Sequence, residues 1–180
     1  RSPCAARDFR SVMFETTAPS RLPRQVFAAI ALVCLGMLGF GLYLQEVVGL
    51  VPCPMCIVQR YALIGVALIA AAAVPFRRAG VHRGAAVAVV LVAGFGAFTA
   101  ARQSWLQWYP PEVVSCGRDF YGMIESFPLK RALPMIFKGS GDCSQVDWTF
   151  LGGSIANWSF LVFCGLVLVA AWLAVRARNS

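Results

Sequence analysis

The sequence is poor in charged residues, in acidic residues above all, and in histidine. Charged residues make up 13% of the 180 residues, where a soluble domain carries roughly 25%, and hydrophobic residues make up 59%. This balance excludes a disordered chain and argues against a water-soluble globule. The only histidine is His82, so no histidine pair is present to hold a haem inside a membrane. Seven cysteines are too few for a disulfide-dense scaffold, yet enough to carry chemistry.

Four apolar segments are long enough to cross a bilayer as helices, for which about 20 mostly apolar residues are needed. We expect the spans at about 25–45, 56–76, 82–101 and 155–175. The first is too long for the apolar core of a signal peptide, which has about 7–15 residues. The sequence therefore predicts an all-α membrane protein, a bundle of four transmembrane helices. Its membrane domain covers residues 25–176, between an N-terminal tail at 1–24 and a C-terminal tail at 177–180.

Basic residues are distributed unevenly over the connecting segments. The two tails and the turn between the second and third spans hold ten arginines and two acidic residues. The connector at about 46–55 has no Lys or Arg, and the connector at about 102–154 has five basic and five acidic residues. The positive-inside rule then predicts cytoplasmic termini and two periplasmic loops. The net charge of +8 is thus explained by membrane orientation and does not indicate nucleic-acid binding.

The cysteines divide according to these segments. Cys4 lies in the N-terminal tail, and Cys34 and Cys164 lie inside spans, where cysteine usually serves as a small apolar packing residue. The two outward loops hold the other four, which are Cys53, Cys56, Cys116 and Cys143. Thiols on the oxidising side of a membrane tend to form disulfides. One pair in each loop is the simplest of the three possible connectivities.

The C-x-x-C spacing of Cys53 and Cys56 is typical of redox exchange. Two alternatives remain open, namely purely structural disulfides and a zinc site made of the four cysteines. Zinc is the less favoured of these, because Cys116 and Cys143 lack the second C-x-x-C that most such sites contain. We assign no residue as a metal ligand.

Cys56 and Arg60 are expected on one face of the first turns of the second span. Pro52 and Pro54 suit the entry to a helix, whose unpaired N–H groups stabilise a thiolate at Cys56. Arg60 follows four residues later and can reach back over Cys56, although it could also extend to the membrane interface. The sequence has no glycine loop for a nucleotide cofactor. A small lipid-soluble oxidant such as a quinone, whose oxygen an arginine can stabilise on reduction, fits this position.

Several motifs occur in an order that resembles one known family. They are C-P-M-C-I-V-Q-R at 53–60, L-Q-W-Y-P at 106–110, the lone Cys116, G-S-G-D-C at 139–143 and W-T-F-L-G at 148–152. This order resembles the disulfide bond formation protein B (DsbB) family. The resemblance implies an enzyme of the bacterial inner membrane that reoxidises a periplasmic DsbA-like thiol oxidase. It also implies that the electrons pass to the membrane quinone pool, as ubiquinone or menaquinone.

The resemblance implies a role for each site residue. The partner attacks the loop pair at Cys116, Cys143 passes the exchange to Cys53, and Cys56 meets the quinone with Arg60 beside it. Two alternatives stay open. One is a non-catalytic membrane protein whose loops are stapled by structural disulfides. The other is a thiol reductant carrier of the vitamin K epoxide reductase type, in which the loop pair precedes the C-x-x-C, the reverse of the order here.

Overall fold

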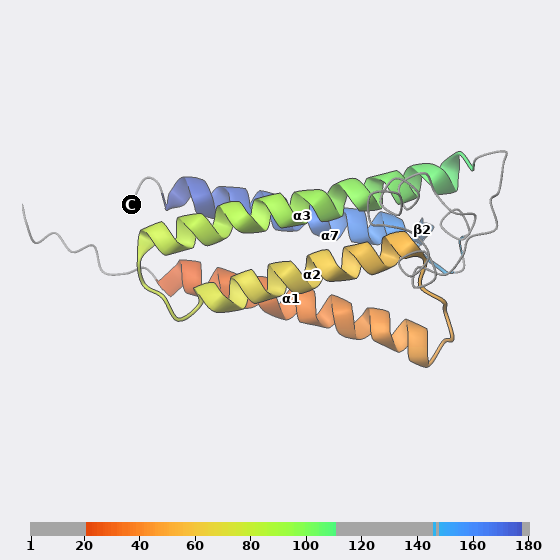
Figure 1. The fold of residues 1–180 in the computed structure, drawn as a ribbon, viewed down its shortest axis with the longest axis horizontal. Coiled ribbons are helices and arrows are strands. Elements are labelled where there is room, and N and C mark those ends of the chain that lie inside the picture. The colour runs from red at the N-terminus through yellow and green to blue at the C-terminus, as the bar shows by residue number, and fades with distance from the viewer. Residues whose placement is uncertain (1–20, 111–145, 147, 178–180) are drawn as a thin grey trace, which may run out of the picture.

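The computed structural model describes residues 21–110, 146 and 148–177, and within them it consists of four long helices and a short hairpin. The helices are α1 (Arg21–Glu46), α2 (Pro54–Ala73), α3 (Ala79–Trp108) and α7 (Ile155–Arg176), with β1 (Thr149–Phe150) and β2 (Gly153–Ser154) directly before α7. Each helix is long and apolar enough to cross a membrane. The helices lie side by side along the long axis of the molecule (Figure 1). The predicted four-helix membrane bundle is confirmed.

The helix boundaries differ from the predicted spans, most of all for α3. The sequence prediction ended this span at residue 101, before a charged residue, whereas the helix continues to Trp108 and so occupies the start of the predicted second loop. A single Arg102 does not break a helix, but Pro110 disfavours helical geometry at Tyr109, which has φ −129° and ψ 74°. Proline sets the ends of α2 in the same way, because Pro54 suits a first turn and Pro75 follows the last.

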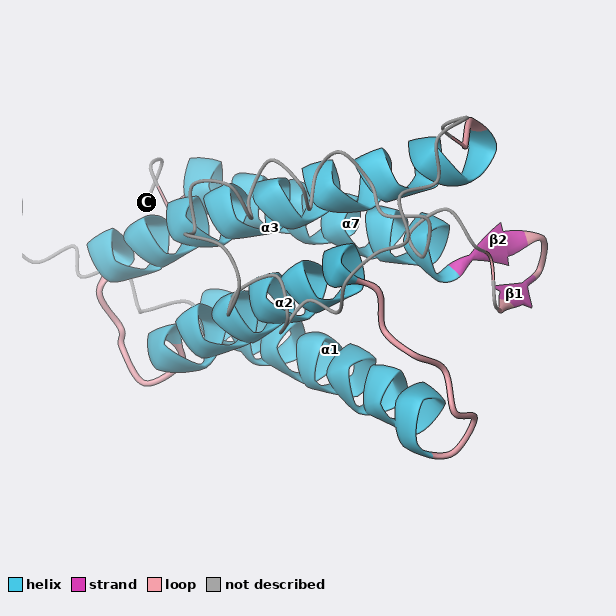
Figure 2. Ribbon diagram, turned by 45° about the vertical axis from the view of Figure 1, so that its right-hand side comes forward, coloured by secondary structure: helices cyan, strands magenta, loops and turns pink. Residues whose placement is uncertain are grey.

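The helices pack in chain order, α1 on α2, α2 on α3, and α3 most extensively on α7 (Figures 1 and 2). At one end of the bundle the Arg24 Nε of α1 donates a hydrogen bond of 2.8 Å to the carbonyl of Val74, at the end of α2. Between α3 and α7, the Phe163 ring lies against Gly96, where a Cβ atom would overlap the ring. A glycine is therefore required for this close approach of the two helices.

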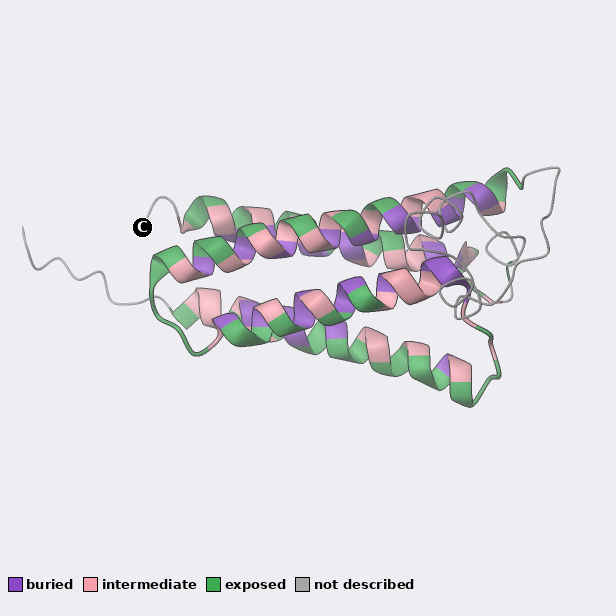
Figure 3. Ribbon diagram, viewed as in Figure 1, coloured by how far each residue is buried: buried purple, intermediate pink, exposed green. Residues whose placement is uncertain are grey.

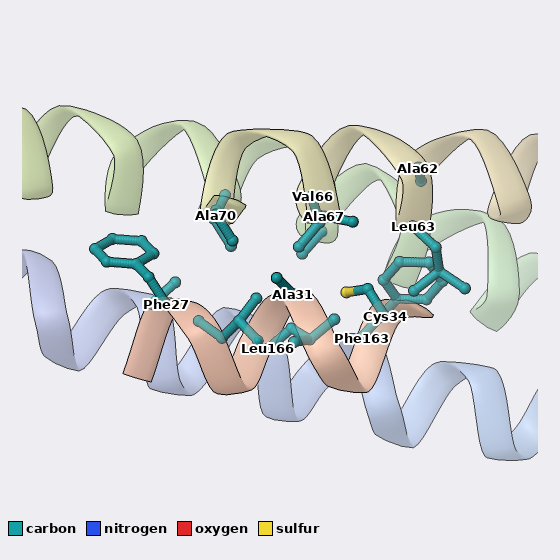
Figure 4. Packing of buried hydrophobic residues seen from close by; sticks show 14 of the residues in the cluster. Phe27, Ala31, Cys34, Ala62, Leu63, Val66, Ala67, Ala70, Phe163 and Leu166 are labelled. Carbon is teal, nitrogen blue, oxygen red and sulfur yellow. The ribbon is translucent and has the colours of Figure 1, made fainter. Parts of the chain in front are cut away.

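Buried residues lie on the faces that the helices turn toward one another, and exposed residues lie on the outer faces (Figure 3). Between α1 and α2, Figure 4 shows Phe27, Ala70 and Val66 pointing into the shared interior. The outer faces are also apolar, since Leu32, Leu91 and Leu168 are 68%, 69% and 70% exposed. An apolar exterior of this extent suits lipid rather than water.

The hairpin lies at the end of the bundle at which α2 begins (Figures 1 and 2). Its two-residue turn has positive φ at Leu151 (50°) and Gly152 (80°), as a type I′ turn requires. The indole Nε1 of Trp158 in α7 donates to the carbonyl of Phe150 at 3.0 Å, and Ser154 caps α7 by accepting from the Asn157 amide. These two hydrogen bonds join the hairpin to the first turns of α7.

Candidate active site

Cys53 and Cys56 form the first turn of α2. Cys53 is the N-cap residue, with extended backbone angles of φ −70° and ψ 161°, and its sulfur accepts a hydrogen bond of 3.4 Å from the Cys56 amide. Pro54 follows it as the first helical residue, where its missing N–H leaves no bond unmade. The two sulfur atoms lie 2.8 Å apart. As the sequence predicts, Cys53 precedes the helix and Cys56 lies at its start.

A buried amide from α3 contacts both sulfur atoms. The Nε2 atom of Gln103 lies 3.3 Å from the sulfur of Cys53 and 3.3 Å from that of Cys56. Its Oε1 atom accepts a hydrogen bond of 2.7 Å from the Nε2 of Gln59, one turn after Cys56 on α2. Both glutamines are buried, at 4% and 5% exposure. The surroundings of the C-x-x-C on α2 thus include a side chain from another helix.

These two glutamines are not among the site residues that the sequence predicts. Gln59 carried a usable signal, because it is a polar residue in an apolar span, three positions after Cys56 and so on the same helix face. Gln103 lay in a segment predicted to be a loop, and nothing in its local sequence marks it as a neighbour of the cysteines.

Arg60 joins α2 to α1. Its Nη1 donates to the Oε1 of Gln45 at 2.6 Å, and its Nη2 donates to the carbonyl of Gly41 at 3.0 Å. The guanidinium thus pairs two helices near the end of the bundle where the cysteines lie. Its predicted place beside Cys56 and a quinone stays a prediction.

A pocket lies beside the two sulfurs, between the end of α1, the start of α2, the end of α3 and the start of α7. Part of its wall is polar, where Ser154 donates a hydrogen bond of 2.6 Å to the Oε1 of Gln107. The rest is mostly apolar, so a small apolar molecule in the pocket would lie next to Cys53 and Cys56. The pocket is lined by Leu44, Leu50, Val51, Pro52, Cys53, Cys56, Gln103, Gln107, Val146, Trp148, Ser154 and Ile155.

The remaining cysteines divide between the bundle and the undescribed segments. Cys34 is buried in the core cluster, in keeping with a packing role, and Cys164 is half-buried on α7. The predicted site residues Cys116 and Cys143 lie outside the described residues, as does Cys4.

Comparison with known proteins gives a consistent result along the chain. A family model described as "Disulfide bond formation protein DsbB" matches residues 23–173. The chain is 68% identical over 161 residues to "Disulfide bond formation protein B" of Albidiferax ferrireducens, covering 88% of this chain and 92% of that protein.

Proteins with the same name give similar values. The one from Polaromonas naphthalenivorans is 66% identical over 159 residues, covering 88% and 95% of the two chains. The one from an Azoarcus species is 52% identical over 162 residues, covering 86% and 94%. The chain therefore belongs to the DsbB family, as a multi-pass membrane thiol oxidoreductase of disulfide bond formation.

Proposed function

We propose that this protein reoxidises a periplasmic DsbA-like thiol oxidase in the bacterial inner membrane and reduces a membrane quinone, ubiquinone or menaquinone. The partner's dithiol reduces a Cys116–Cys143 disulfide, and this pair in turn reduces a Cys53–Cys56 disulfide. The Cys53–Cys56 dithiol then reduces the quinone to the quinol. Each exchange transfers two electrons and two protons, so the relay is balanced from the partner to the quinone.

The observation that carries this proposal is the pocket beside the C-x-x-C. Cys53, Cys56 and Gln103 line it together with apolar residues from the end of α1 and the start of α7. A quinone head is a flat, mostly apolar ring with two carbonyl oxygens, so apolar walls with a few polar groups suit it. A disulfide that only staples a loop has no need of a pocket, and this favours redox chemistry over the structural alternative.

Anaerobic electron transfer tests the proposal directly. The protein, reduced and freed of reductant, is mixed with a short-chain ubiquinone or menaquinone analogue. We expect quinol to form with loss of the Cys53–Cys56 thiols, one quinol for each disulfide formed. Intact thiols and no quinol with either analogue would overturn the proposal. Addition of a reduced DsbA-like oxidase then tests the first half of the relay, since turnover should continue until the partner is oxidised.

The proposed membrane orientation makes a prediction of its own. Reporter fusions after Gly49 and after Ser140 should show a periplasmic location, and a fusion after Gly80 a cytoplasmic one, because the basic residues are concentrated on one side. Paired alkaline phosphatase and fluorescent protein fusions measure both outcomes. A cytoplasmic signal at Ser140 would contradict the relay, because the cysteines would then face a reducing compartment.

The order of exchange predicts which variant traps the partner. Thiol exchange proceeds through a mixed disulfide, and a second thiol is needed to resolve it. In Cys143→Ser, Cys116 can first exchange with the Cys53–Cys56 disulfide, forming a Cys116–Cys53 bond and a Cys56 thiol. A partner whose second cysteine is replaced by alanine then attacks Cys116 and releases Cys53, and it has no thiol left to resolve the mixed disulfide. This covalent complex should accumulate on non-reducing gels. Cys116→Ser is the matched variant, expected to trap no partner. Equal trapping by the two variants would show that Cys116 is not the attacked residue.

A further inference from the structure

Gln59 and Gln103 lie beside the C-x-x-C but have no role in the proposed relay. Two buried amides meet inside a membrane bundle, from α2 and α3, and one of them also reaches the sulfur atoms. Polar side chains in such segments are costly unless they are hydrogen-bonded, and they frequently mark functional sites. Here the Gln59 amide is satisfied by Gln103, and the Gln103 amide is directed at both members of the C-x-x-C.

The hydrogen bonds fix the direction in which Gln103 points. Its Oε1 atom accepts from Gln59 at 2.7 Å and lies 3.8 Å from the Cys56 sulfur, whereas its Nε2 atom is closer to the sulfurs, 3.3 Å from each. The amide nitrogen carries two hydrogens, so it can donate one hydrogen bond to each sulfur. A hydrogen bond donated to a charged acceptor is stronger than one to a neutral acceptor, so this arrangement favours a thiolate over a thiol or a disulfide.

Arg60 is a cation near this end of the bundle, and its hydrogen bonds go to α1. The guanidinium of Arg60 donates to Gln45 and to the carbonyl of Gly41 on α1, at 2.6 and 3.0 Å. Among the described residues, the side chain that donates to both sulfurs is the neutral Gln103, which adds no net charge there.

We propose that Gln103 stabilises the reduced Cys53–Cys56 pair by donating to its sulfurs, and that Gln59 is a positioning residue that orients the Gln103 amide. The inference rests on the proposed redox role of the pair and deepens it. Reduction of the disulfide by two electrons and two protons yields two thiols, and one of them releases a proton to become the thiolate. Gln103 gains and loses nothing in this step. It shifts the equilibrium toward the reduced pair, making Cys53–Cys56 a stronger oxidant than the same pair without the amide.

The test measures the redox equilibrium of this pair alone. The full-length protein carries Cys116→Ser and Cys143→Ser and is held in thiol–disulfide buffers, without quinone or partner. Differential alkylation and mass spectrometry then give the oxidised fraction of the peptide that contains Cys53 and Cys56. Gln103→Met keeps the side-chain length and removes the donors. We expect it to shift the equilibrium about tenfold toward the disulfide and to slow the alkylation of Cys56 at neutral pH.

Matched variants separate this role from a merely structural one. Gln59→Met should shift the equilibrium in the same direction by a smaller factor, because the Gln103 amide remains but is no longer oriented. Gln25→Met makes the same change at an exposed position of α1, at the other end of the bundle, and should leave the equilibrium unchanged. Where Gln103→Met fails to fold, Gln103→Asn withdraws the amide from the sulfurs and should give the same direction of shift.

Two results would overturn the inference. One is an unchanged equilibrium in a folded Gln103→Met or Gln103→Asn protein, and the other is an equal shift in Gln25→Met. Failure of the proposed function is distinguishable from either, since it appears as absent quinol formation by the wild-type protein. The equilibrium of the cysteine pair requires neither quinone nor partner.

Discussion

Quinone reduction is expected to fall to background in Cys56→Ser. A quinone accepts two electrons, and a single remaining thiol at Cys53 cannot supply them by closing a disulfide within the C-x-x-C. Serine is close to cysteine in size, and its hydroxyl can still accept a hydrogen bond from Gln103, so the first turn of α2 should remain folded. The measurement is the anaerobic formation of quinol from a short-chain quinone, with the reduced protein as electron donor.

The matched control is Cys164→Ser, the same change at a half-buried cysteine on α7. Its quinone reduction should equal that of the wild-type protein, which shows that the loss in Cys56→Ser is specific to the site. Normal quinol formation by Cys56→Ser would contradict the proposed relay, because electrons would then reach the quinone by a route other than the C-x-x-C.

Arg60→Lys is expected to lower quinone turnover by about 10²–10³, the usual effect of removing one donor from a developing oxyanion. Lysine keeps the positive charge but lacks the planar fork with which a guanidinium can hold a quinone oxygen while it keeps its contacts with α1. We expect the loss to appear as a lower kcat or as a raised KM for quinone. Membrane insertion and the loop disulfides should be normal. Unchanged quinone kinetics in Arg60→Lys would leave Arg60 without a catalytic role.

The structure supplies a control that separates catalysis from helix pairing. Arg60 holds α1 through Gln45 and Gly41, so Arg60→Lys also weakens the contact between α1 and α2. Gln45→Met removes one acceptor of that contact and leaves the guanidinium in place. If Arg60 only pairs helices, the two variants should lower turnover alike. If it acts on the quinone, Gln45→Met should retain far more activity than Arg60→Lys.

The sequence was sufficient to predict the helices but not their ends. Long apolar runs predict membrane spans because the bilayer leaves few other options for the backbone. Charge is a weaker guide to where a helix stops, as Arg102 inside α3 illustrates. Proline is the better guide, since Pro54, Pro75 and Pro110 all lie within two residues of a helix end.

The site was predictable only where it is local in sequence. The C-x-x-C and its place at a helix N-terminus follow from residues 52–60, and the structure has both. The Gln59–Gln103 contact depends on how α2 packs against α3 over a separation of 44 residues. The hydrogen bonds of Arg60 to Gln45 and Gly41 likewise depend on how α1 packs against α2. Spacing along one helix carries no information about either of these contacts.

The contact between Gly96 and Phe163 also constrains how this sequence can change over time. A methyl group at position 96 would overlap the phenylalanine ring, so α3 and α7 admit a larger residue there only after position 163 has become smaller. The effect of a substitution at one position thus depends on the residue at the other, which is epistasis with a steric cause. The order of the two changes matters, because shrinking Phe163 first leaves a cavity that a later alanine at 96 can fill, whereas the reverse order begins with a clash.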